Sequence, residues 1–178
     1  MKRCLIGALF VAYATASLAG DDGHEARHRP VRVFDANGHV IGDLTIFSAQ
    51  NGVAFTVGNA TAVVHVTRVQ DASYHFSATD FKWIATSFAQ YTSPDCSGDP
   101  IVNSIDGPRP AITLRQGNDV TVYIAAEGVQ QSLTVRSGLN FNPPGCVTYA
   151  QPITISAYPA AAKLVISRDH PEPLRIGF

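Results

Sequence analysis

The sequence predicts an all-β protein, either an antiparallel β-sandwich or a barrel-like sheet of short strands. Short runs rich in Val, Ile, Thr and Tyr recur along the chain, and Gly, Asn, Asp and Pro separate them. Hydrophobic residues make up 46% of the chain and charged residues 15%, the composition of a folded globule rather than a disordered chain. The 178 residues leave room for one domain. The runs cover residues 52–58, 59–69, 110–116, 118–128, 131–138 and 146–159.

Residues 1–19 have the three parts of a secretory signal peptide. Lys2 and Arg3 form a basic start, residues 4–14 form an apolar stretch, and small residues precede a cleavage site after Ala19. The apolar stretch is shorter than the ~20 residues that span a bilayer, so an uncleaved membrane anchor is the less favoured alternative. We therefore expect an exported protein, periplasmic or extracellular.

After the signal peptide, residues 20–30 are polar and end in Pro30, which predicts a flexible arm. Residues 31–178 then form the single β-rich domain. Loss of the signal peptide reduces 13 basic residues to 11, against 14 acidic ones, and leaves a net charge of about −3. We expect no nucleic-acid partner and no cofactor.

The clearest local signal is Asn37-Gly38, which stands between two runs rich in β-branched residues at 31–47. This dipeptide readily adopts the positive φ angles of a tight turn, so it predicts a β-hairpin.

The segment 77–92 is ambiguous. Ser77 and Asp80 have the spacing of a capping box, and apolar residues follow at helical spacing, which would fit a helix. With a period of two, one face instead collects apolar side chains while Thr and Ser occupy the other, which suits a strand. We favour a strand over residues 83–92. The face with a period of two comprises Phe81, Trp83, Ala85, Ala89 and Tyr91.

The cysteines predict a structural disulfide. Cys4 leaves with the signal peptide, and Cys96 and Cys146 remain in a chain bound for an oxidising compartment. Cys96 lies in a turn, and each cysteine stands beside prolines and a glycine and next to a strand-like run, which allows the ~5.5 Å separation of Cα atoms that a disulfide prefers. A redox pair would have the cysteines two residues apart, unlike these.

Four stretches, "GHVIGDL", "YTSPDCSGDP", "PPGCV" and "HPEPLRIGF", carry a resemblance to a known family. The chain resembles uncharacterised bacterial β-rich domains, secreted or associated with phage tails, that have a D-x-x-G-x-x-V/I-G hairpin and a Y-T-x-x-D/N-C-x-G turn. The resemblance covers most of residues 31–178. It implies a β fold and a role outside the cytoplasm, and it implies no catalytic residues.

The strongest catalytic pattern is H-E-x-x-H at residues 24–28, which places two imidazoles on zinc with a glutamate as base. A catalytic site needs this pentapeptide inside a supported helix, whereas here it stands in the polar arm and stops at Pro30. We expect no metal there. No spacing of serine, histidine and aspartate selects a nucleophile, and we expect His65 and His75 to be ordinary strand residues.

Asp35 and the Asp95–Asp99 turn resemble fragments of calcium loops, but they lack the remaining oxygen ligands, so turn formation explains them better. Dense aromatic residues between positions 74 and 91 fit a core better than a binding platform, with Trp83 the first to test. The candidate binding loops are the Asn37-Gly38 hairpin and the turn from Asp95 to Asp99.

We therefore expect a secreted or surface-associated binding or structural module without catalysis, with an unknown protein or glycan as its ligand. An extracellular hydrolase is the alternative, either metal-dependent through the N-terminal arm or with an unrecognised polar site.

Overall fold

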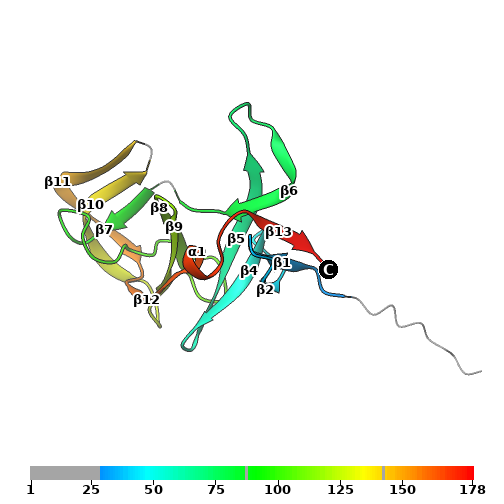
Figure 1. Cartoon of the computed structure of the whole chain (residues 1–178). Coiled ribbons are helices and arrows are strands. Elements are labelled where there is room, and N and C mark those ends of the chain that lie inside the picture. The colour runs from blue at the N-terminus through cyan, green and yellow to red at the C-terminus, as the bar shows by residue number, and fades with distance from the viewer. Residues whose placement is uncertain (1–28, 87, 142) are drawn as a thin grey trace, which may run out of the picture.

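The protein is described by a computed structural model that covers residues 29–86, 88–141 and 143–178. The expected signal peptide, its cleavage site and the H-E-x-x-H pentapeptide lie outside these residues, as does most of the expected polar arm. Every named pair of strands in the described part is antiparallel, as the sequence predicts (Figure 1).

The largest sheet has seven strands in the order β2-β1-β13-β6-β5-β4-β3 and closes almost into a barrel. Its closure depends on Leu44, the one residue between β2 and β3, whose N–H donates to the Val31 carbonyl at 2.7 Å. Because β2 pairs with β1 while β3 pairs with β4, this continuous stretch of chain brings the two ends of the sheet together. The strands are β1 (Arg32–Phe34), β2 (Val40–Asp43), β3 (Thr45–Phe47), β4 (Gln50–Val57), β5 (Ala60–Gln70), β6 (Phe76–Trp83) and β13 (Leu174–Gly177).

Two three-stranded sheets complete the fold, with the orders β12-β9-β8 and β11-β10-β7. A short helix, α1 (Ile166–Asp169), leads from β12 towards β13. The strands are β7 (Phe88–Tyr91), β8 (Ala111–Gln116), β9 (Asp119–Ala125), β10 (Gln131–Phe141), β11 (Pro144–Ala157) and β12 (Ala160–Val165).

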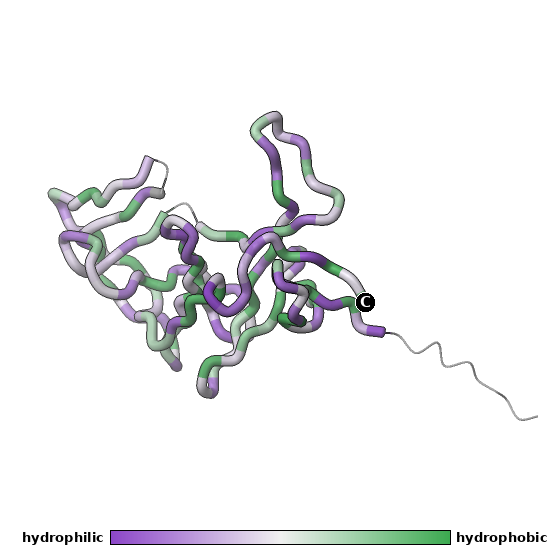
Figure 2. Tube along the Cα trace, viewed as in Figure 1, coloured by the Kyte–Doolittle hydropathy of each residue, from purple (hydrophilic) through white to green (hydrophobic). Residues whose placement is uncertain are grey.

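The sheet containing β9 is the middle layer of the molecule. Val120, Val122 and Ile124 of β9 belong to the main core, which they share with buried side chains of the barrel-like sheet. Tyr123, on the opposite face of β9, packs with Leu114 against buried residues of β7. The alternation along one strand thus serves two cores, and Figure 2 shows the corresponding changes between hydrophobic and hydrophilic residues along the strands.

The six runs predicted from composition are confirmed as β4, β5, β8, β9, β10 and β11. The described residues of segment 77–92 form strands and no helix, but the expected strand at 83–92 is wrong in its bounds: β6 ends at Trp83 and β7 begins at Phe88. The Ser77 hydroxyl does accept the Asp80 N–H at 3.0 Å, as in a capping box. This contact lies in an irregular part of β6, opposite the register shift between Arg68 and Gln70.

The predicted hairpin at Asn37-Gly38 connects β1 to β2. The fully buried carboxylate of Asp35 accepts the N–H groups of Asn37 and His39 at 2.8 and 2.9 Å, and Gly38 has a φ of 82°. Gly38 also donates its N–H to the Asp35 carbonyl at 3.0 Å. Turn formation therefore accounts for the aspartate of this loop.

The predicted disulfide is present, with the Cα atoms of Cys96 and Cys146 5.9 Å apart. Cys96 follows β7 and Cys146 lies in β11, and β10 runs between these two strands. Ser137 of β10 is buried beneath the turn, where its hydroxyl donates to the Ser93 carbonyl and accepts the Cys96 N–H at 3.0 Å. The disulfide therefore joins the two outer strands of the sheet across its middle strand.

In the described part of the chain, no helix has the length and apolar character needed to cross a membrane.

Candidate functional site

A cleft of about 740 Å³ lies between the barrel-like sheet and the end of the β10–β11 hairpin where β10 ends and β11 begins. Residues 82–86 form one wall, at the end of β6 and in the segment that follows. Leu139 and Asn140 of β10 and Pro144 of β11 face them. Pockets of this volume are typical of sites for small ligands or protruding side chains.

The cleft exists because the chain crosses between sheets after β6. Ile84 donates its N–H to the His65 carbonyl of β5 at 2.9 Å, and Thr86 donates its N–H to the Thr113 carbonyl of β8 at 2.8 Å. The crossing segment is thereby fixed to both the barrel-like sheet and the middle layer. β7 then pairs with β10, so the β10–β11 hairpin stands across from the end of β6.

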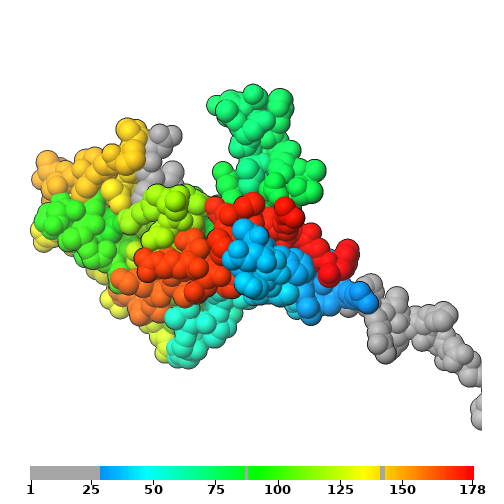
Figure 3. All heavy atoms as spheres, in the orientation of Figure 1, coloured from blue at the N-terminus to red at the C-terminus, as the bar shows by residue number. Residues whose placement is uncertain are grey.

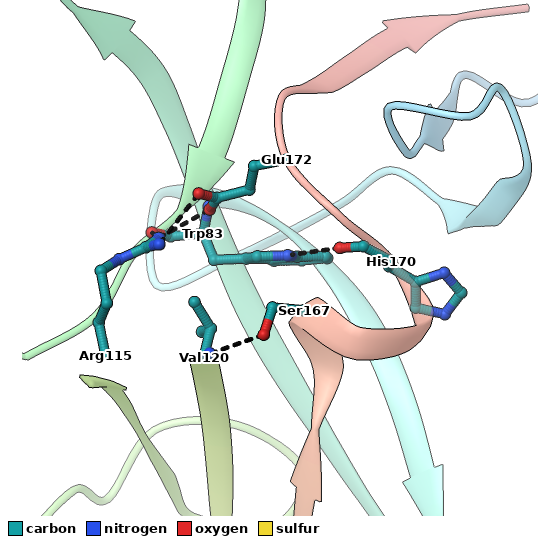
Figure 4. A network of polar contacts seen from close by, with 6 residues as sticks. All are labelled: Trp83, Arg115, Val120, Ser167, His170 and Glu172. Atoms are coloured by element: carbon teal, nitrogen blue, oxygen red, sulfur yellow. Dashed lines mark hydrogen bonds and ion pairs between the residues drawn. The ribbon is translucent and has the colours of Figure 1, made fainter. Parts of the chain in front are cut away.

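A polar network fixes the floor of the cleft (Figure 4). The Arg115 guanidinium makes two contacts with the Glu172 carboxylate, at 2.7 and 3.0 Å, and donates to the Trp83 carbonyl at 3.2 Å. Glu172 also accepts the Trp83 N–H at 2.6 Å. Since Arg115 belongs to β8 and Trp83 to β6, the network connects the middle layer with the barrel-like sheet and with the segment before β13.

The same network positions the indole of Trp83. Its Nε1–H points to the carbonyl of His170 at 3.4 Å, and its ring meets Phe55 edge-on at a centroid distance of 5.7 Å. Close by, the hydroxyl of Ser167 accepts the Val120 N–H at 2.8 Å. Helix α1 and the segment after it therefore support the floor from beneath.

Lys82 adds a positive charge to the edge of the cleft. The charge of Arg115 is balanced by Glu172, whereas Lys82 forms no ion pair within the residues that the structure describes. Thr67, Thr86, Gln116 and Asn140 add hydroxyl and amide groups around the apolar walls. The arrangement can hold an apolar group and interact with a carboxylate or hydrogen-bonding groups at its edge.

Trp83 lines this cleft, but it is only 1% exposed. Its ring fills the main core, as the sequence favours, and does not offer an open face for stacking. The Asn37-Gly38 hairpin and the Asp95–Asp99 turn lie on opposite sides of the molecule, the first beside β13 and the second beyond β7 (Figure 1). These predicted binding loops therefore do not share one surface with each other.

The carboxylates of the Asp95–Asp99 turn are engaged within the protein. Asp95 accepts the hydroxyl of Ser97 at 2.7 Å and its N–H at 3.2 Å, and these hydrogen bonds lower the pKa of Asp95. Asp99 pairs with Lys163 at 2.8 Å, and the hydrogen bond raises the pKa of Lys163. Both aspartates hold the turn that carries Cys96.

His65 lies in β5, as predicted, and lines a second hollow of about 330 Å³ together with Ser48 and Asp106. Its Nε2 is buried without a hydrogen-bond partner, but the Ser48 hydroxyl donates to Asp106 at 2.9 Å rather than to the imidazole. The three groups are therefore not arranged as a nucleophile with its base. His75 is not a strand residue: it lies in the loop between β5 and β6, where its Nδ1 is 3.5 Å from Asp71.

No sequence pattern predicts the cleft and its network, because Arg115, Glu172 and Leu139 come from segments far apart in the chain. The loop between β5 and β6 does carry a signal in the sequence. The five residues 71–75 repeat the D-A-x-x-H pattern of residues 35–39. Among the residues that the structure describes, no group of three or more His, Cys, Asp and Glu side chains could hold a metal ion.

No family model, no curated protein and no solved structure matches the chain.

Proposed function

We propose that the chain is an exported binding module without catalysis, which recognises a partner through the cleft between the barrel-like sheet and the β10–β11 hairpin. The cleft itself is the observation that carries this proposal, because its walls are hydrogen-bonded strands and the crossing segment that is fixed to two sheets, and its floor is fixed by the Arg115–Glu172 pair. Such a preformed site loses little conformational entropy when it binds. The disulfide supports an oxidising compartment, periplasmic or extracellular.

The chemistry of the cleft favours a protein partner over a glycan. Recognition of a sugar by stacking requires an exposed aromatic face, and Trp83, the aromatic residue of the cleft lining, is buried. Aliphatic walls such as Leu139 and Ile84 instead suit an apolar side chain from a protein, while Lys82 and the amides at the edge can meet its neighbouring polar groups.

Peptides displayed on phage and selected on the exported chain would test this proposal. We expect selected peptides to carry an aromatic or aliphatic anchor. Asn140→Trp places a large ring in the cleft and should weaken their binding at least tenfold, whereas Asn103→Trp, at an exposed position outside the cleft, should leave it unchanged. Binding that is unaffected by Asn140→Trp, or a glycan array that yields the only ligands, would contradict the proposal.

The metal-dependent form of the hydrolase alternative depends on the H-E-x-x-H sequence at residues 24–28. Deletion of residues 20–30 separates the two functions. A metal-dependent hydrolase would lose all of its activity, whereas the binding module would keep its fold and its affinity for selected peptides.

A further inference from the structure

The end of β5, the loop after it and the beginning of β6 project from the body of the molecule as a hairpin. We call residues 69–79 the β5–β6 arm. Figures 1 and 3 show it standing away from the body, with an open hollow between it and the ends of β10 and β11. Thr67 and Lys82 at the base of the arm line the cleft, so the cleft opens into this hollow.

The tip of the arm carries two exposed aromatic side chains. Tyr74 is 80% exposed and Phe76 is 64% exposed. An exposed aromatic pair at the end of a projecting hairpin is a common anchor for protein recognition, because each ring removes a large apolar area from water when it is bound.

The tip loop has the same hydrogen bonds as the loop that joins β1 and β2. Asp71 accepts the N–H groups of Ser73 and His75 at 2.8 and 2.9 Å through its side chain. Its own N–H donates to the His75 carbonyl at 3.0 Å, and the Tyr74 N–H donates to the Asp71 carbonyl at 3.1 Å. Each bond has its equivalent in the loop that Asp35 forms with residues 37–39.

The two loops differ at the position with positive φ. The first loop has Gly38 there, with a φ of 82°, and the arm has Tyr74, with a φ of 66°. An L-residue with a large side chain is disfavoured in this conformation, and glycine would serve the turn better. The exposed ring at a position that suits glycine is therefore not explained by folding of the loop.

The arm is held rigidly at its base. The Arg68 guanidinium lies over the Phe81 ring, 4.7 Å from its centroid, and donates to the carbonyls of Ser77 and Ala78 at 3.0 and 2.6 Å. At about 3.3 Å per residue, the chain runs roughly 10 Å outward from Arg68 to Asp71, where the tip loop with Tyr74 turns it back into β6. The tip therefore cannot fold back into the cleft at its own base.

We propose that two copies of this chain pair through their arms, and that each tip inserts Tyr74 and Phe76 into the cleft of the other copy. This inference rests on the proposed binding role of the cleft and names its partner. The placement of the two sites favours a second copy. The tip and the cleft lie at opposite ends of one arm, so a two-fold axis beside the middle of the arm brings each tip onto the partner cleft in a single closed arrangement.

The chemistry of the two surfaces is complementary. The tip presents two aromatic rings and the partly exposed carboxylate of Asp71, and the cleft presents aliphatic walls and the ammonium group of Lys82. Four rings that are now mostly exposed would bury roughly 400–700 Å² of their own surface, and the walls that receive them about as much. The total, roughly 800–1,400 Å², reaches the lower part of the range for specific interfaces.

Sedimentation velocity of the exported chain from about 1 μM to about 1 mM tests the proposal. We expect a monomer–dimer equilibrium. Tyr74→Gly and Phe76→Ser should each weaken the dimer at least tenfold, the size of effect expected for a central aromatic contact. We expect Tyr74→Gly to keep the fold of the loop, because Gly38 occupies the equivalent position with a positive φ. The matched control is Val129→Ser, at an apolar residue that is 83% exposed outside the arm and the cleft.

Cross-linking gives an independent readout of the two-fold geometry. A mixture of the Tyr74→Cys and Gln116→Cys variants should form a disulfide-linked dimer, because Gln116 lines the cleft. Neither variant alone should do so, since the two-fold axis keeps identical positions apart. A mixture of Val129→Cys and Gln116→Cys is the control and should stay uncross-linked.

A chain that remains monomeric at all concentrations would overturn the pairing, as would a dimer that both tip variants leave intact. Monomeric protein that binds lipid vesicles through Tyr74 would also overturn it and assign the tip to a membrane surface. If the chain is monomeric while selected peptides still bind the cleft, the self-pairing fails and the proposed function stands. If the chain is monomeric and selected peptides also fail to bind the cleft, both the self-pairing and the proposed function are wrong.

Discussion

Gly38 and Tyr74 occupy equivalent positions in two loops with the same hydrogen bonds, so they offer a matched pair of substitutions. We expect Gly38→Ala to lower the free energy of unfolding by about 1 kcal/mol, because alanine resists a φ of 82° even though no atom lies within 4 Å of the added Cβ. Tyr74→Gly should raise that free energy by up to about 1 kcal/mol for the converse reason. Urea unfolding at a low protein concentration measures both.

Gly145→Ala is the control for this pair, because Gly145 has no positive φ and an added Cβ there meets open space. We expect it to change stability by less than about 0.5 kcal/mol. Equal losses at Gly38 and Gly145 would show that the backbone conformation of the loop is not the cause.

Asp35 gives the second prediction at the scale of single residues. Burial alone would raise its pKa, but the backbone N–H groups of His39 and Asn37 and the charge of His39 lower it below its ordinary value of 3.8. A lowered pKa in the folded state stabilises the protein above the ordinary value, and this contribution disappears as the pH falls through the lowered pKa. We expect the urea midpoint to fall between pH about 6 and about 2 more steeply in the natural protein than in Asp35→Asn.

The asparagine of this variant can still accept the two backbone N–H groups through its Oδ1, so the loop is preserved while the titration is removed. Asp95 and Glu127 also have lowered pKa values, and both remain in the variant. The difference between the two acid profiles therefore isolates Asp35. Parallel profiles would contradict this assignment.

At the scale of the elements, the Arg115–Glu172 pair connects β8 with the segment before β13 beneath the cleft. Both side chains are partly buried, 31% and 23% exposed. Arg115→Ala leaves the Glu172 carboxylate without its cation and should lower the free energy of unfolding by roughly 1–3 kcal/mol. It should also weaken peptide binding at the cleft, because the end of β6 loses its support.

Arg168→Ala is the matched control, since it removes an arginine from the more exposed pair with Asp119, where the side chains are 69% and 48% exposed. We expect a loss of at most about 0.5 kcal/mol there. Similar losses in the two variants, measured by urea unfolding, would mean that the network beneath the cleft has no special role.

The strands that the sequence predicts are those with their own local signal. Residues 60–70 and 119–125 are rich in Val, Ile, Thr and Tyr, so each predicts a strand without reference to its neighbours. β12 is different, because three alanines begin it, and its pairing with β9 makes it a strand. The strand conformation of β12 therefore comes from tertiary contact, and no local pattern predicts it.

The candidate site follows the same division. The disulfide could be predicted, because Cys96 and Cys146 are the two cysteines that follow the expected signal peptide and each stands beside prolines and a glycine. The cleft could not, because Lys82, Arg115 and Leu139 meet only after three sheets have assembled. The D-A-x-x-H repeat lies between these cases: its two loops are visible in the sequence, but the projection of the second one from the body is not.

At the scale of the whole molecule, the three cores differ in size, and this difference sets how the disulfide contributes. The main core is the largest of the three and spans the barrel-like sheet, the middle layer and α1. The other two cores include side chains of the sheet formed by β7, β10 and β11, which we call the outer sheet. Each has only three buried residues among those that the structure describes. The sheet formed by β7, β10 and β11 therefore depends on Cys96–Cys146 more than the rest of the protein does.

Replacement of both cysteines by serine tests this dependence. The loop that the disulfide closes should contribute on the order of 4 kcal/mol by restricting the unfolded chain. We expect the free energy of unfolding of the double variant to fall by up to that amount, and the loss of protection to differ between the sheets. Amide hydrogen exchange should accelerate most in β10 and β11, while β5 and β9, which pack in the main core, keep more of their protection.

Trp83 provides the second measurement, because it is the one tryptophan of the chain and lies in the main core. In the double variant, the sheet formed by β7, β10 and β11, followed by amide exchange, should unfold at a lower urea concentration than the main core, followed by Trp83 fluorescence. In the natural protein, amide exchange and fluorescence should report a single transition. If the exchange rates of all three sheets rise together, and Trp83 fluorescence follows them, the outer sheet is not a separate unit, and the disulfide stabilises the molecule as one cooperative whole.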